Sequence, residues 1–152
     1  DEGSIKRAAT HVKSLGGSLA IIDKRRTGNR VEQANFIGGP IEGKIAVMFD
    51  DMISTGGSIC GAAHLVKKHG AEKIYIGATH GVLSGNALEN IRNAPVDNIL
   101  LTDTIPQKED LFQNLKVLSV APLLGEAIRR IHSNESVSRL FRDRDMPFWD
   151  GK

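Results

Sequence analysis

The stretch that most constrains the fold is residues 45–59, where an apolar run leads into two carboxylates, a glycine-bearing loop and a helical pattern. Ile45–Phe49 is a short, continuous apolar run, which predicts a strand buried on both faces. Ser58 follows two glycines and is predicted to cap a helix through its hydroxyl. The apolar residues then recur at helical spacing, at Ile59, Ala62, Ala63 and Val66. We therefore expect a strand, a loop and a helix in direct succession.

This predicted loop has the chemistry of a sugar-phosphate site. A phosphate binds readily at the first turn of a helix, because the backbone N–H groups there lack partners and carry a partial positive charge. The paired glycines Gly56 and Gly57 allow close approach of the backbone, and the hydroxyl of Thr55 adds a donor. Asp50 and Asp51 stand at the carboxyl end of the strand, where ligands bind in open α/β sheets. Because carboxylates repel phosphate, we expect them to bind sugar hydroxyls or a divalent cation.

Strand-like and helix-like stretches alternate along the whole chain. The strands are predicted at residues 19–22, 45–49, 73–79, 98–103 and 115–120, and a mobile loop or short hairpin at 27–39. The alternation predicts an α/β fold with a doubly wound, mainly parallel sheet of about five strands and helices on both faces. Right-handed crossovers place the strand-to-helix loops at one edge. The segments expected to converge there are Asp23-Lys24, Asp50-Asp51, Thr79-His80 and Thr102-Asp103.

Several other residues have a structural and a functional interpretation. Cys60 is interpreted as a small core residue, although a lowered thiol pKa is conceivable in the first turn of a helix. His80 is interpreted as a satisfied histidine, whereas Asp103 fits equally a pocket residue or the cap of the following turn. Pro122 is predicted to open the last helix. The apolar stripe of that helix is expected to face the core, with Leu124, Ala127, Ile128 and Ile131.

Composition limits the classes of function that remain. The chain has 152 residues, of which 40% are hydrophobic, enough for a single domain over 1–152 with a charged tail at 139–152. A net charge of +2 favours neither nucleic acid nor an anionic membrane as a partner. No run reaches the roughly 20 apolar residues of a membrane span, and no signal peptide is visible. With one cysteine the chain forms no internal disulfide, which fits a cytoplasmic location.

The loop Asp50–Ser58 resembles the ribose-5-phosphate loop of the type I phosphoribosyltransferase fold. Within that fold the chain is similar to the ribose-phosphate diphosphokinase family, from Asp1 to about Leu140. Asp1-Glu2-Gly3 resembles an aspartate–glycine motif, which implies that Asp1 binds Mg²⁺. Residues 23–26 resemble a catalytic flexible loop, which implies that Lys24 and Arg26 stabilise charge on the transferring diphosphate. Residues 135–141 resemble a carboxyl-terminal motif, which implies a regulatory phosphate or ADP site at Ser136 and Ser138.

The resemblance implies that diphosphate is transferred from ATP to the anomeric hydroxyl of ribose 5-phosphate, with Mg²⁺ bridging the phosphates. Asp50 and Asp51 would hold the ribose hydroxyls. The 5-phosphate would lie against Ser54, Thr55, Gly56, Gly57 and Ser58. Ser54 stands where many family members have a third acid. The family implies a homo-oligomer built from dimers, often a hexamer.

The main departure from the family pattern shapes our expectations. The family's amino-terminal domain, which supplies most of the adenine site, has no counterpart in this sequence. The chain alone is therefore expected to bind ribose 5-phosphate but to turn it over poorly or not at all. The alternatives are a nucleobase phosphoribosyltransferase, which shares the loop, and a non-catalytic subunit that regulates a diphosphokinase.

Overall fold

The computed structural model of the chain describes residues 2–27, 30–108 and 110–141. The chain begins with helix α1 and an antiparallel hairpin, with bounds α1 Glu2–Leu15, β1 Ala20–Thr27 and β2 Arg30–Gly38. A parallel sheet follows, built from β3 Ile45–Ile53, β4 Lys73–Gly81, β5 Asn98–Thr102 and β6 Leu115–Leu118. The helices of this second part are α2 Gly57–Lys68, α3 Ala87–Asn93, α4 Ala121–His132 and the 3₁₀ helix η1 Val137–Phe141.

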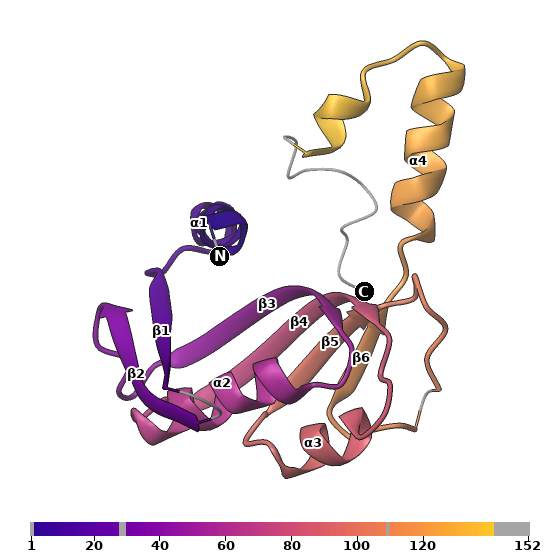
Figure 1. Ribbon diagram of the computed structural model, residues 1–152. Helices are drawn as coiled ribbons and strands as arrows, with labels where there is room; N and C mark the ends of the chain where they lie inside the picture. The colour runs from indigo at the N-terminus through magenta and orange to yellow at the C-terminus, as the bar shows by residue number, and fades with distance from the viewer. Residues whose placement is uncertain (1, 28–29, 109, 142–152) are drawn as a thin grey trace.

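The parallel sheet has the strand order β3-β4-β5-β6, which is also the order along the chain. Because right-handed crossovers then all fall on one side, α2 and α3 cover the same face of the sheet (Figure 1). Helix α1 lies over the opposite face, where the ring of His11 stacks on Phe49 with centroids 4.1 Å apart. The predicted α/β fold with helices on both faces is confirmed, and the parallel sheet has four strands instead of about five.

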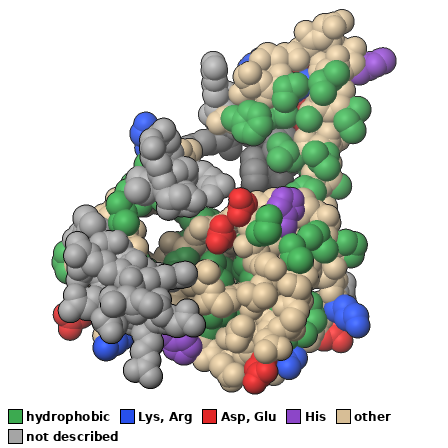
Figure 2. Space-filling model, in the orientation of Figure 1, with side chains coloured by type: hydrophobic (Ala, Val, Ile, Leu, Met, Phe, Trp, Pro, Cys, Tyr) green, Lys and Arg blue, Asp and Glu red, His purple; other side chains and the backbone are tan. Residues whose placement is uncertain are grey.

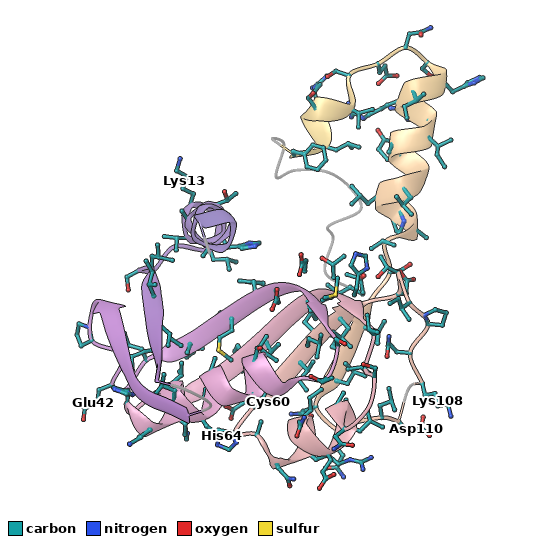
Figure 3. The ribbon with its side chains drawn as sticks, viewed as in Figure 1. Lys13, Glu42, Cys60, His64, Lys108 and Asp110 are labelled. Atoms are coloured by element: carbon teal, nitrogen blue, oxygen red, sulfur yellow. The ribbon has the colours of Figure 1, made fainter. Side chains whose placement is uncertain are left out.

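The hydrophobic core lies between the sheet and the α2–α3 layer. Its largest fully buried side chains come from β4 and β5, namely Ile74, Ile76, Ile99 and Leu101. Cys60 packs into the same layer from α2 and is 5% exposed, whereas His64 on the same helix is exposed (Figure 3). Burial raises the pKa of the Cys60 thiol. The interpretation of Cys60 as a core residue is therefore confirmed, since a reactive thiolate needs a lowered pKa.

The prediction that Ile45–Phe49 is buried on both faces is wrong. Ala46 and Met48 pack toward the core, but Ile45, Val47 and Phe49 are between 42% and 55% exposed. Strand β3 is the first strand of the parallel sheet, and the face that carries these three side chains lies opposite α2 and α3. A continuous apolar run indicates a strand, but it does not show which of its faces another element covers.

The prediction that residues 19–22 form a strand of the parallel sheet is also wrong. They belong to β1, which pairs with β2 in a separate antiparallel hairpin, so the hairpin interpretation of 27–39 is confirmed. The connection between β1 and β2 is too short for a parallel crossover, which needs about a dozen residues. Asp23 and Lys24 lie within β1, opposite Asn35 and Ala34. They do not follow a strand at the ligand edge of the sheet.

Helix α4 begins as predicted, with proline in its first turn, but its apolar stripe does not face a core. Leu124, Ile128 and Ile131 are between 56% and 67% exposed. The helix leaves the sheet beyond β6 and contacts η1 (Figure 1), and hydrophobic side chains line it in Figure 2. The stripe predicts an amphipathic helix correctly, but the sheet does not extend beneath it. No helix in the described part of the chain has the length and apolar content to cross a membrane.

A cluster of charged side chains holds α4 against η1. The carboxylate of Glu126 accepts hydrogen bonds from Arg129 at 2.8 Å and from the buried Arg130 at 2.7 Å. Arg130 also donates to the carbonyl of Ser136 at 3.1 Å, and Arg129 donates to Glu135 at 2.8 Å. The hydrogen bonds from Arg129 and Arg130 lower the pKa of Glu126 to about 2. The contact between α4 and η1 therefore depends on ionised carboxylates.

This cluster predicts acid sensitivity of the α4–η1 contact. Because the pKa of Glu126 is lower when folded than its ordinary value of 4.5, its stabilising effect is complete above that value and is lost as the pH falls toward 2. We expect the amide NMR shifts of residues 136–141 to move in this acid range. In Glu126→Gln these amide shifts should already differ from those of the wild type at neutral pH, and they should change less as the pH falls. Glu72→Gln, an exposed substitution before β4, is the control, and wild-type behaviour of Glu126→Gln would contradict the prediction.

Candidate functional site

An open pocket of about 150 Å³ lies where β3 ends and α2 begins. Asp50 and the run 52–59 line it. Strand β3 continues to Ile53, so Asp50 and Asp51 belong to its carboxyl-terminal part, and both are exposed. The predicted succession of strand, paired carboxylates, glycine loop and helix is confirmed. Asp50 and Ser54–Ser58, which the sequence assigned to a sugar-phosphate site, line the pocket together with Met52, Ile53 and Ile59, whereas Asp51 is not among its lining residues.

The amino terminus of α2 differs in one respect from the prediction. Ser58 was expected to cap the helix, but the N-cap is Gly56, and Ser58 lies within the first turn. Gly56 is buried and left-handed, with φ 75°, a conformation that glycine adopts without the steric cost of a side chain. No side-chain hydrogen bond caps the helix. The positive end of α2 therefore faces the pocket through glycine backbone, whose N–H groups an anion can approach.

The loop is braced from outside the pocket by residues far away in the sequence. Backbone N–H groups of Leu83 and Ser84 each donate, at 3.0 Å, to the carbonyls of Ile53 and Ser54. The hydroxyls of Ser54 and Ser84 are also 3.0 Å apart. Asn90 of α3 donates from Nδ2 to the carbonyl of Thr55 at 2.8 Å. Sequence reasoning missed Ser84 and Asn90, because no local pattern links α3 to a loop 35 residues earlier.

The ends of β4 and β5 lie beside the loop, as predicted. Met52 pairs with His80, and Thr102 donates to the carbonyl of Thr79 at 2.6 Å. The Nδ1 atom of His80 is 2.9 Å from the hydroxyl of Thr104, which itself donates to Thr79. The interpretation of His80 as a satisfied histidine is confirmed. Three of the four segments expected at this edge are therefore neighbours, and the Asp23-Lys24 segment is the exception.

Asp103 joins this edge of the sheet to α4. Its carboxylate accepts a hydrogen bond from the N–H of Val120 at 2.8 Å, where α4 begins. Hydrogen bonds from Ser119 and Val120 lower the pKa of Asp103. The two interpretations left open for this residue were a pocket residue and a cap. The observed contact is at the start of α4, 17 residues later, and not in the turn that directly follows Asp103, so neither interpretation describes it.

Other predicted site residues lie partly outside the described structure. Asp1 is outside the described residues, and Lys24 and Arg26 are described by their backbone, within β1. Ser136 precedes η1, and Ser138 lies in its first turn. Among the side chains that the structure describes, no three His, Cys, Asp or Glu residues are grouped to hold a metal. The adjacent carboxylates Asp50 and Asp51 nevertheless fit Mg²⁺, which is commonly held by one or two carboxylates together with substrate oxygens and water.

Comparison with known proteins shows which family the chain belongs to. Residues 25–142 match the family model described as the phosphoribosyl synthetase-associated domain. The chain belongs to this family. Ribose-phosphate pyrophosphokinase of Rhodopirellula baltica is 64% identical over 146 residues, which cover 95% of this chain and 46% of that protein. The pyrophosphokinase of Thermotoga maritima is 48% identical and is matched over 93% of this chain and 45% of its own length.

A solved structure supports the same placement of this phosphoribosyl synthetase-associated domain. The phosphoribosylpyrophosphate synthetase of Mycobacterium smegmatis superposes with a TM-score of 0.77 at 40% identity, covering 87% of this chain and 43% of the other. The predicted α/β fold and the resemblance to the diphosphokinase family are thereby confirmed. The chain spans less than half the length of these relatives.

Proposed function

We propose that this chain is the ribose-5-phosphate-binding part of a ribose-phosphate diphosphokinase. The observation that carries the proposal is the pocket itself. It combines a glycine-capped helix terminus, which suits a phosphate, with the exposed carboxylate of Asp50, which suits a sugar hydroxyl, and the exposed Asp51 is its neighbour in β3. The names of the relatives favour this activity over a nucleobase phosphoribosyltransferase or a regulatory subunit.

In the proposed complex the 5-phosphate lies against Ser54–Ser58, and Asp50 and Asp51 accept hydrogen bonds from the ribose hydroxyls. This orientation leaves the anomeric hydroxyl facing solvent, where the oxygen can attack the β-phosphorus of ATP. As this bond forms, the bond between the β-phosphorus and the bridging oxygen breaks, and AMP leaves with that oxygen. The proton of the anomeric hydroxyl passes to solvent. Lys24 and Arg26 are proposed to stabilise the negative charge on the transferring diphosphate. Mg²⁺, when bound, would neutralise phosphate oxygens, with Asp1 as a proposed ligand.

Further parts of the proposal concern the larger protein. Because the chain matches less than half of its relatives' length, we propose that ATP binding and turnover need sequence beyond these residues. The proposed assembly is a homo-oligomer built from dimers, and the exposed stripe of α4 supplies apolar surface that an assembly would bury. Ser136 and Ser138 are proposed to contribute to a regulatory phosphate or ADP site. A cytoplasmic location is proposed from the single cysteine.

The proposal is tested by calorimetric titration of this chain with ribose 5-phosphate in the presence of Mg²⁺. We expect saturable binding to the wild type and weaker binding, by about tenfold, to Asp51→Asn and to Thr55→Val. The first variant removes the charge of a proposed hydroxyl acceptor, and the second removes a proposed phosphate donor. Thr10→Val on α1 is the matched control and should bind like the wild type.

Two results would contradict the proposal. The first is the absence of binding by the wild type, both alone and when the remainder of a relative's chain is restored. The second is binding that both variants retain at full affinity. Free ribose should bind more weakly than ribose 5-phosphate, since most of the proposed contacts are to the phosphate.

A further inference from the structure

Helix α3 contacts the phosphate loop although it lines no part of the pocket. Asn90 is half-buried on α3 and donates from Nδ2 to the carbonyl of Thr55 at 2.8 Å. The loop leads into α2, and α2 itself packs beside α3, because both helices cover the same face of the sheet (Figure 1). Asn90 therefore contacts the loop without lining the pocket.

This hydrogen bond fixes the orientation of one peptide group in the loop. A peptide unit is planar and trans, so its C=O and N–H point in opposite directions. With the Thr55 carbonyl directed to Asn90, the N–H of Gly56 is directed away from α3. Rotation of this peptide would break the bond and lose its net contribution to stability. Asn90 therefore opposes rotation of the loop at the residue that caps α2.

Packing also restricts Gly56, the residue that caps α2. A side chain added at Gly56 would place Cβ 3.6 Å from Ile91 and 3.7 Å from Asn90, so α3 lies directly against the cap of α2. Gly56 itself is left-handed. The loop conformation thus depends on the seating of α3 as well as on the loop's own sequence.

We infer that Asn90 is a positioning residue for the phosphate-binding loop, acting through the Thr55 carbonyl and not by contact with the ligand. The inference deepens the proposed function and rests on it for the identity of the ligand. Ser84 supports the loop one residue earlier, through its N–H and hydroxyl contacts with Ser54. Asn90 and Ser84 together brace the loop from two different segments of the chain.

The test compares Asn90→Ala with Asn93→Ala, an exposed substitution at the end of the same helix. We expect Asn90→Ala to weaken ribose 5-phosphate binding by about three- to tenfold, the effect of one hydrogen bond. Asn93→Ala should bind like the wild type. The loss should be mainly in the phosphate contribution, so that inorganic phosphate alone should also bind more weakly to Asn90→Ala, whereas the affinity for free ribose should not change. Unchanged affinity in Asn90→Ala would overturn the inference.

A second measurement tests the inference without any ligand. Amide hydrogen exchange at residues 56–58 should become faster in Asn90→Ala but not in Asn93→Ala, while exchange in β4 stays constant. If Asn90→Ala does not fold, Ser84→Ala should give the same local effect. Equal exchange in variant and wild type overturns the positioning role even if the chain binds ribose 5-phosphate. Conversely, faster exchange in a wild-type-like fold that binds no ribose 5-phosphate would contradict the proposed function alone.

Discussion

Gly56→Val is expected to abolish measurable binding of ribose 5-phosphate and to lower the free energy of unfolding by about 2–4 kcal/mol. A side chain at φ 75° costs about 1–2 kcal/mol in the left-handed region. The new methyl groups would also press on Cys60, Ile91 and Asn90, whose atoms lie 3.5–3.7 Å from the added Cβ. The backbone must move to relieve both costs. Movement of the N-cap displaces the donors of the first turn of α2.

Gly61→Ala is the matched control for this experiment. Gly61 lies on the same helix, and a Cβ there meets nothing within 4 Å. Alanine is favoured over glycine inside a helix, so this variant should be more stable by about 0.5–1 kcal/mol and bind normally. Denaturant unfolding and calorimetry measure the two effects. Normal ligand affinity in Gly56→Val would show that the left-handed cap is not needed for the site.

Gly81→Ala should have a comparably large effect on stability, through the core and not through backbone conformation. An added Cβ would lie 2.6 Å from Cδ1 of Leu101, which is fully buried, and 2.9 Å from Nε2 of Gln107. Gln107 is held in place because it donates to the carbonyls of Gly81 and Ile105. Overpacking of this kind costs about 1–3 kcal/mol. The thermal midpoint should fall by about 2–4 °C for each kcal/mol.

A second substitution separates this clash from other causes. Leu101→Val removes the Cδ1 atom, so the double variant Gly81→Ala/Leu101→Val should be more stable than the sum of the two single effects predicts. Gly125→Ala on α4 is the control, since a Cβ there meets nothing within 4 Å. Strict additivity of the two core substitutions would contradict the proposed clash.

Local patterns predicted the pocket correctly because its chemistry is contiguous in sequence. Asp50 through Ser58 supplies the strand end, the loop and the helix start, and each follows from residue type and spacing. Ser58 was wrongly predicted to be the cap, because it lies close to the start of α2 and serine is a common capping residue. The actual N-cap is the left-handed glycine two positions earlier. The bracing by Asn90 could not be predicted, since it depends on how α3 packs beside α2.

The errors in the fold have one physical origin, which is that an apolar pattern does not identify the element that covers it. Val47 lies in the continuous apolar run of β3 and Ile128 in the periodic stripe of α4, and both are exposed. Residues 20–22 form a strand as predicted, but they pair with β2, because the hairpin is closer in sequence than the parallel sheet. For Asp103, residue type alone fitted two roles, and neither was the observed contact with Val120 at the start of α4.

The sequential strand order has a consequence for how the domain acquires its fold. Each strand of the parallel sheet pairs with the strand that follows it in the chain, so every pairing closes one short connection, and α2 and α3 lie in the first two of them. Loop closure costs less entropy when the partners are near in sequence, and low contact order favours rapid folding. The pocket lies inside the first of these units, between β3 and α2. The ligand site can therefore begin to form as soon as β4 has paired with β3. It becomes rigid when α3, which carries Asn90, packs beside α2.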